Sequence, residues 1–296
     1  MLFLGEFFAL LTAISWSCGS FSFAEAAQRI GSIQLNVNRI ILASVFLIIT
    51  ILVFNFDYSI SGYQLKFLVV SGIIGIVIGD TFLFSAYKKI GARLSMLLMS
   101  AAPIISTILA FIFLNESVSL TAIIGMTITI SGIVLVAINS DNSPNAKYKI
   151  TKVGIMLGLL ASAGQAIGLI FAKEAFNSGE LNEFVATFVR IFSSVLFILP
   201  ITIAIKKYKN PIKLYIKDTK AFLFTIIGTV FGPFLGITLS LLAIKYTKIG
   251  IASTIMATVP VIMLPMSKYL HKEKFNWKII LGTFLAVGGI AIIFLR

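Results

Sequence analysis

The chain has 296 residues, of which 58% are hydrophobic and 12% are charged, and its formal net charge is +13. Since a soluble domain carries about 25% charged residues, this composition excludes a soluble fold, and the wealth of apolar residues excludes a disordered chain. A single cysteine, Cys18, and a single histidine, His271, exclude disulfides, thiolate metal clusters and most metal or acid–base chemistry, so we expect no metal and no cofactor.

Ten apolar segments are long enough to span a bilayer, which takes about 20 residues per helix. Their apolar runs are continuous, as helices that face lipid require. In chain order they cover residues 3–24, 33–54, 65–87, 92–114, 119–138, 153–173, 184–205, 220–244, 249–270 and 277–295. The sequence therefore predicts an all-α integral membrane protein of ten transmembrane helices.

The first segment ends in Ala24-Glu25-Ala26, which has the pattern of a signal-peptide cleavage site. No Lys or Arg precedes the segment, however, and it has a counterpart at 153–173 in the second half. We therefore expect a retained first helix.

A polar segment rich in Asn and Ser divides the chain near its middle and is typical of a linker. It predicts two domains, residues 3–140 and 152–296, joined by a linker at 141–151. The two halves are similar: at a constant shift of 157 positions, Pro103 matches Pro260, and three further pairs follow without a gap. These pairs are Glu116 with Glu273, Gly125 with Gly282, and Gly132 with Gly289. Because each half has five helices, an odd number, the second half should enter the membrane from the opposite side, which is the inverted repeat of many transporters.

Basic residues are unequally divided between the two ends of the predicted helices. The side that holds both termini carries five Lys and Arg residues, and the other side carries 18. Since cytoplasmic loops are enriched in Lys and Arg, this count predicts that both termini lie outside.

The repeated residues resemble the drug/metabolite transporter superfamily, in its ten-helix branch with two EamA domains. The Arg that opens each second helix of that family matches Arg39 and Arg190, and its Pro in each fourth helix matches Pro103 and Pro260. The resemblance covers nearly the whole chain, once in each half.

Some positions depart from the family pattern. The Trp-Gly pair of the first helix is displaced here to Trp16 and Gly19, and Gln165 stands where the second half should have the Trp. The Gly-Glu pair that ends each fourth helix keeps only Glu116 and Glu273.

The resemblance implies a carrier that exports or exchanges small metabolites, often amino acids. It also implies that the termini lie in the cytoplasm, which is opposite to the orientation that the charge count predicts.

Three of the charged residues within the predicted spans are candidates for a role in transport or structure. Asp80 is a candidate for proton coupling or for binding a substrate amine, and the alternative is a hydrogen-bonded structural carboxylate. Arg190 is a candidate for binding a substrate carboxylate with its planar guanidinium, and the alternative is an interfacial or structural role. We expect Arg39 to reach the membrane interface or to pair with helix-end carbonyls, and the alternative is that it binds a substrate carboxylate.

Two residues are candidates for the walls of a substrate cavity. Trp16 lies mid-helix, away from the interfacial belts where Trp is common, so it either faces a cavity or packs inside the bundle. Gln165, its approximate repeat partner, offers amide donors and an acceptor. Further cavity candidates are Tyr87, Ser100, Thr238 and Thr258.

Prolines and glycines inside the spans predict kinks and close packing. Pro103, Pro233 and Pro260 remove backbone hydrogen bonds, and they act either as hinges or as static bends. Glycines at four-residue spacing predict close helix contacts without a ligand role. They are Gly75 with Gly79, Gly154 with Gly158, Gly164 with Gly168, and Gly228 with Gly232 and Gly236.

Together these features predict a secondary transporter of the bacterial cytoplasmic membrane, and not an enzyme. No GxxxxGK[ST] sequence for ATP binding is present, so we expect an ion gradient, with protons as the proposed ion, to drive transport.

We expect helices 1–4 and 6–9 to move around a central cavity, and helices 5 and 10 to form a scaffold or a homodimer face. The expected partners are a small-molecule substrate and membrane lipids, whose anionic headgroups the lysines of 206–220 should contact, and no nucleic acid. The alternatives are a flippase for a lipid-linked substrate and a non-transporting membrane scaffold.

Overall fold

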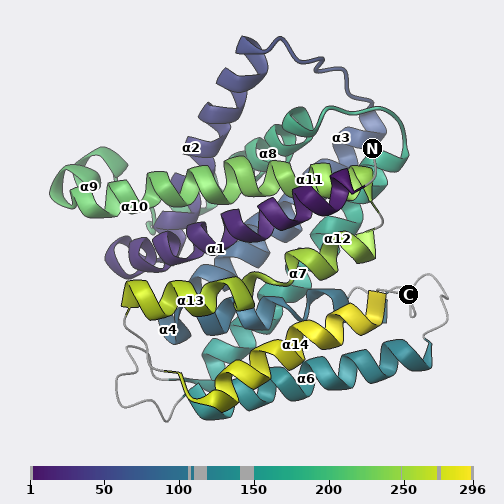
Figure 1. Cartoon of the computed structure of the whole chain (residues 1–296). Helices are drawn as coiled ribbons and strands as arrows, with labels where there is room; N and C mark the ends of the chain where they lie inside the picture. The colour runs from purple at the N-terminus through teal and green to yellow at the C-terminus, as the bar shows by residue number, and fades with distance from the viewer. Residues whose placement is uncertain are drawn as a thin grey trace.

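The computed structural model describes residues 3–105, 108–109, 119–140, 150–247, 249–271 and 275–294, and within these ranges the regular structure is entirely helical (Figure 1). Seven helical stretches there are long and apolar enough to cross a membrane, and Trp277–Ile292 is a shorter apolar helix. The elements are α1 (Leu4–Ile30), α2 (Ser32–Val53), α3 (Gly62–Gly72), η1 (Ile73–Gly79), α4 (Asp80–Met99), α6 (Leu120–Ser140), α7 (Lys152–Asn177), α8 (Glu183–Ala204), α9 (Pro211–Lys217), α10 (Thr219–Thr229), η2 (Val230–Phe234), α11 (Leu235–Tyr246), α12 (Ile249–Met256), α13 (Val259–His271) and α14 (Trp277–Phe294). The multi-pass helical fold is confirmed.

The third predicted span of each half contains a π-helical segment. In the first half η1 begins at Ile73, and in the second half η2 begins at Val230, which is again a shift of 157 positions. Pro233 lies inside η2, where its missing N–H favours an irregular turn. Since π-helical turns often occur at functional sites, the two segments draw attention to the region between them.

The fourth predicted span of each half is broken at equivalent positions. A turn at residues 100–101 separates α4 from the helical residues that begin at Ala102, and a turn at 257–258 separates α12 from α13. Pro103 and Pro260 are therefore each the second residue of a new helical stretch, where proline costs no hydrogen bond. Both prolines mark the start of a helix, whereas a position inside a kinked helix was expected.

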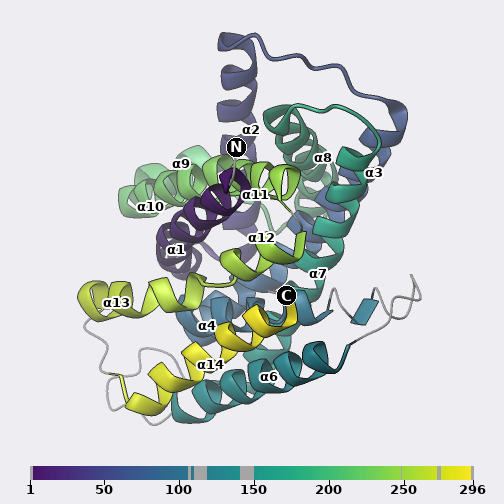
Figure 2. The ribbon, with the colours of Figure 1, turned by 45° about the vertical axis from the view of Figure 1, so that its right-hand side comes forward.

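Helices of the two halves interleave in the bundle. Helix α1, from the first half, packs against α10, η2 and α11 of the second, while α7, from the second half, packs against α3, η1 and α4 of the first (Figures 1 and 2). Glycines allow this close approach: a Cβ atom added at Gly164 would lie 2.8 Å from the Cα atom of Gly79. Gly228 and Gly232 lie against the ring of Phe23 in the same way. The expected packing role of the spaced glycines agrees with these contacts.

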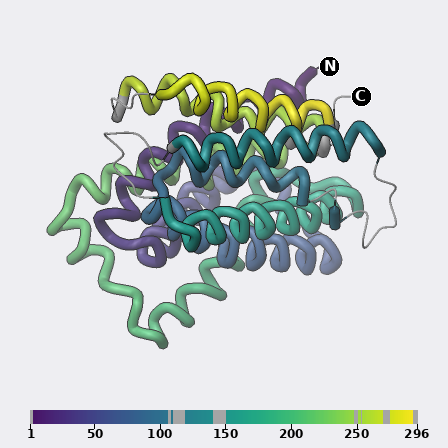
Figure 3. Tube along the Cα trace, turned by 90° about the horizontal axis from the view of Figure 1, so that it is seen from below, coloured from purple at the N-terminus to yellow at the C-terminus, as the bar shows by residue number. Residues whose placement is uncertain are grey.

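Helices α6 and α14, the fifth and tenth predicted spans, lie side by side at one edge of the molecule (Figures 1 and 3). Added Cβ atoms at Gly132 and Gly289 would lie 2.4 Å from the backbone nitrogen of Ala286 and 2.6 Å from the carbonyl oxygen of Gly125, respectively. The two helices therefore meet backbone to backbone.

Gly289→Ala is expected to lower the free energy of unfolding by about 1–3 kcal/mol, because overpacking a close contact forces the backbones apart. Gly288 next to it has no atom within 4 Å of an added Cβ, so Gly288→Ala is a matched control. That control should be neutral or slightly stabilising, since alanine restricts the unfolded chain. Thermal unfolding of both variants in detergent measures the difference, and equal midpoints would contradict the close contact.

The short helix α9 lies outside the long helices (Figure 3). Its Ile212 and Ile216 side chains are both exposed. Lys213 and Lys217 lie on the same helix. At its far end Asp218 caps α10, accepts a hydrogen bond from the backbone N–H of Ala221, and pairs with Arg29 at the end of α1. The segment is thus held against the end of the bundle.

Candidate functional site

A cavity lies in the middle of the bundle, bordered by α1, α2, η1, α4, α7, α8, η2 and α11 and by the breaks in both fourth spans. It offers about 130 Å³ to the centres of water molecules, against roughly 10–15 Å³ for one water. A small organic molecule therefore has room there.

Most of the predicted site residues meet at this cavity. Trp16, Asp80, Tyr87, Gln165 and Arg190 all line it although they come from five places in the sequence. Pro103 and Ser100 also border it, and Pro233 and Pro260 each follow a lining residue, Gly232 or Val259. The hydroxyls of Thr238 and Thr258 instead donate to nearby backbone carbonyls, those of Phe234 and Ile255.

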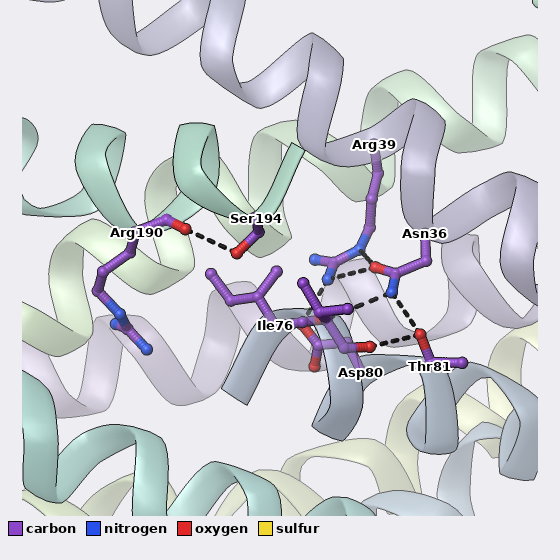
Figure 4. A network of polar contacts seen from close by, with 8 residues as sticks. Asn36, Arg39, Ile76, Asp80, Thr81, Arg190 and Ser194 are labelled. Carbon is purple, nitrogen blue, oxygen red and sulfur yellow. Dashed lines mark hydrogen bonds and ion pairs between the residues drawn. The ribbon is translucent and has the colours of Figure 1, made fainter. Parts of the chain in front are cut away.

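Asp80 is the acceptor of a buried ion pair with Arg39 (Figure 4). The Arg39 guanidinium also donates to Asn36 Oδ1, at 3.1 Å from Nε and 2.9 Å from one terminal nitrogen. Asn36 in turn donates to the Ile76 carbonyl of η1 and to Thr81 Oγ1, at 3.3 and 2.9 Å. The network joins α2 to the point where the π-helical segment passes into α4.

The aromatic rings of Phe84 and Phe23 stabilise the same guanidinium. The Arg39 Cζ atom lies 4.6 Å from the ring centre of Phe84 and 5.5 Å from that of Phe23. These are distances at which a cation is attracted to an aromatic face. The ion pair, the Asn36 amide and the two rings together stabilise the positive charge of Arg39, a residue that is 3% exposed.

The expectation that Arg39 reaches the membrane interface is wrong. Its position near the start of a predicted span indicated an interfacial side chain, but tertiary packing buries that end of α2 against η1, α4 and α10. The signal that was available is the lone Asp80 in the next span, because charges inside membrane helices usually pair with one another.

Arg190, the repeat partner of Arg39, has no such partner. It is 3% exposed, and its Nε atom is buried without a hydrogen bond. Asp80 attracts it electrostatically, but no hydrogen bond or ion pair joins the two side chains, and in the view of Figure 4 Ile76 lies between them.

Much of the remaining cavity lining consists of aromatic and thioether side chains. Tyr87 donates a hydrogen bond to Ser20 Oγ at 3.0 Å and also contacts Met96 Sδ, which links α1 to α4. Trp16 and Gln165 lie on different helices, α1 and α7, and both are half-buried. A bound molecule therefore meets aromatic faces, thioethers and a few polar groups.

Glutamates near the ends of α1 and α7 have polar partners in the structure. Glu25 pairs with Arg29, and Glu174 accepts a hydrogen bond from the Tyr63 hydroxyl at 3.1 Å. Glu116 and Glu273 lie outside the described residues. In the described part of the chain, no three His, Cys, Asp or Glu side chains gather as metal ligands would.

The model of the EamA-like transporter family matches residues 3–138 and again residues 152–295. The chain belongs to the EamA-like transporter family. It is a member of the drug/metabolite transporter superfamily, and a transporter and not an enzyme.

Two further proteins are similar along nearly the whole chain. A protein described as an uncharacterized transporter, from Archaeoglobus fulgidus, is 20% identical over 288 residues, which cover 97% of this chain and 96% of that protein. A crystal structure of a protein with 13% identity has a TM-score of 0.70 and covers 98% of this chain and 96% of its own. At that identity the second similarity shows the fold alone.

Proposed function

We propose that this EamA-family transporter is a secondary-active carrier that moves a small metabolite by exposing its central cavity alternately to the two sides of the membrane. The observation that carries this proposal is the cavity itself, which contains two buried arginines and one aspartate at membrane depth. Ionisable groups are costly there and usually mark a substrate or ion pathway.

The helix contacts suggest which parts move. One bundle is α1 with α10, η2 and α11, and the other is α7 with α3, η1 and α4. The start of α8 goes with the second bundle, because α8 packs against α3 and η1 more extensively than against α11. Since each bundle is joined by glycine-mediated contacts, we infer that these mixed bundles move as units, in place of the sequence halves 1–4 and 6–9. The cavity lies between them.

Polar contacts join the two bundles at the end that holds the start of α1 and α3. Lys245 on α11 pairs with Glu183 at the start of α8, and Lys173 on α7 donates to the Ile244 carbonyl at 2.6 Å. Opening the cavity toward that side requires these contacts to break. An ion pair that is partly exposed is worth about 0–1 kcal/mol, so it allows such opening.

Covalent closure of this end is expected to stop transport. In a Cys18→Ser background, Glu183→Cys with Lys245→Cys should lose transport on treatment with a reducible bifunctional thiol reagent, and regain it on reduction. Counterflow of amino acids, organic anions and organic cations in proteoliposomes identifies a substrate and then measures the effect.

A matched cysteine pair tests whether the link must join the two bundles. Tyr63→Cys with Glu174→Cys replaces a contact between α3 and α7 at the same end but within one bundle. Its cross-linked form should still transport. Equal loss in both cross-linked proteins, or full transport by the first, would contradict the proposed movement.

For coupling and location we propose proton-driven export across a bacterial cytoplasmic membrane, with Asp80 as the group that exchanges the proton. Its carboxylate borders the cavity and is the only acidic side chain among the described lining residues. Lysines on and around α9 suit contact with anionic headgroups, which would place that end on the cytoplasmic face. Reporter fusions at the C-terminus decide the orientation.

A further inference from the structure

The two repeats treat their equivalent arginines differently. Arg39 has Asp80 as its counterion, and at the shift of 157 positions that relates the third spans the equivalent of Asp80 is Ile237. Both Ile237 and Arg190 line the cavity. The second repeat therefore keeps the arginine and replaces the carboxylate with an apolar side chain.

The second arginine also lacks the amide that orients the first. Asn36 lies three residues before Arg39 and accepts two of its hydrogen bonds, whereas the residue three before Arg190 is Thr187, whose hydroxyl donates to the Glu183 carbonyl of its own helix. The Arg190 guanidinium is thus buried with no hydrogen bond to any described residue. A guanidinium offers five donors in a planar fork, and leaving them unused in a buried site is costly.

The charge of the cavity follows from its lining. Arg39, Asp80 and Arg190 are the only charged residues among the described lining residues, so one pair and one unpaired cation leave a net charge of +1. One bound monoanion neutralises that charge. A zwitterion does not, because its own net charge is zero, and the only carboxylate among the described lining residues that could pair with its ammonium group is already held by Arg39.

We propose that Arg190 binds the carboxylate of an organic monocarboxylate substrate, which takes the place that Asp80 occupies beside Arg39. The proposal deepens the transporter function above and rests on it. The planar guanidinium of Arg190 can donate two parallel hydrogen bonds to the two oxygens of a carboxylate. The remaining body of the ligand lies against Trp16, Phe23 and the methionines of the cavity, so it is apolar or aromatic.

The first test compares charged and neutral ligands of one shape on the purified full-length protein. A panel of aliphatic and aromatic monocarboxylates, with phenylacetate among them, is measured against the matching amides and against phenylalanine. Stabilisation against heat and direct calorimetric binding are the readouts. We expect at least one carboxylate to bind, and its amide and amino acid to bind at least tenfold more weakly.

The second test uses variants of the arginine. Arg190→Gln should weaken carboxylate binding by about 10- to 100-fold, as the loss of charged hydrogen bonds implies, and Arg190→Lys should retain part of it. Arg29→Gln removes an exposed arginine at the end of α1 and is the control that should bind normally.

Stability of the ligand-free protein gives an independent readout. Because the buried guanidinium has no partner, Arg190→Gln should unfold at the same temperature as the wild-type protein or higher. A lower unfolding temperature would mean that Arg190 is a structural residue and would overturn the proposal.

Three other outcomes would overturn it: binding of no carboxylate in the panel, equal binding of the amide, or unchanged binding by Arg190→Gln. Transport of a neutral or zwitterionic substrate by the same preparation would then leave the transporter function intact and reject only the anion site. Absence of transport with carboxylate binding retained would reject the transporter function and keep the site.

Discussion

Asp80→Asn is expected to abolish transport while the protein still inserts in the membrane. The substitution removes the counterion of Arg39, which is 3% exposed, and raises the net charge of the cavity from +1 to +2. Breaking a buried pair by removal of one partner costs about 3–5 kcal/mol, since it leaves a charge uncompensated. Transport in proteoliposomes and thermal unfolding in detergent measure the two effects.

The double variant Arg39→Gln with Asp80→Asn separates stability from function. It removes both charges, so it should recover most of the stability that Asp80→Asn loses, as replacement of a buried pair by neutral groups usually does. If the aspartate takes part in coupling, transport stays absent in the stable double variant. Full transport by Asp80→Asn, or by the double variant, would reject a coupling role for the pair.

Among Gly→Ala substitutions in the bundle, Gly72→Ala is expected to disrupt helix packing the most. A Cβ atom at this position would lie 2.3 Å from the carbonyl oxygen of Arg190 and 2.9 Å from Ser194 Oγ. The nearest obstacle is backbone, so α3 and α8 must separate. Overpacking of this kind costs about 1–3 kcal/mol and occasionally more, and here it also displaces the residue to which we assign the substrate anion.

Gly62→Ala on the same helix is the control for Gly72→Ala. An added Cβ at Gly62 meets nothing within 4 Å, and the residue begins α3 just after the Ser61 cap. The control should keep the wild-type unfolding temperature and transport, while Gly72→Ala should lower the first and weaken substrate binding. An identical unfolding temperature for the two variants would show that α3 and α8 can move apart without loss of stability, which would contradict the prediction.

The interleaving of the helices has a consequence for how the repeats produce a carrier. Helix α1 packs mainly against the second half and α7 mainly against the first, and residues of both halves line the cavity. The halves are alike where backbone geometry matters, as in the π-helical segments and the broken fourth spans. They differ where ligand chemistry matters, as in Asp80 against Ile237.

The sequence by itself determined the membrane class, most span positions and the repeat, because each depends on local apolar length and on residue spacing. It also identified five residues that line the cavity, because polar or aromatic residues inside apolar spans are recognisable from the sequence alone. They are Trp16, Asp80, Tyr87, Gln165 and Arg190. Prolines inside apolar spans predicted kinks, although the position of Pro103 and Pro260 at the start of new helices needed the backbone.

Only the tertiary structure decided which charges meet. Arg39 and Arg190 are equivalent in sequence, yet one is paired, across 41 positions, and the other is not. That difference depends on how α2 and α8 pack against η1 and its surroundings, and contacts between segments so far apart leave no local pattern in the residues of either. The same holds for the mixed bundles, because helix–helix pairing in a membrane is chosen by the fit of small residues on opposing surfaces and not by hydrophobicity, which all spans share.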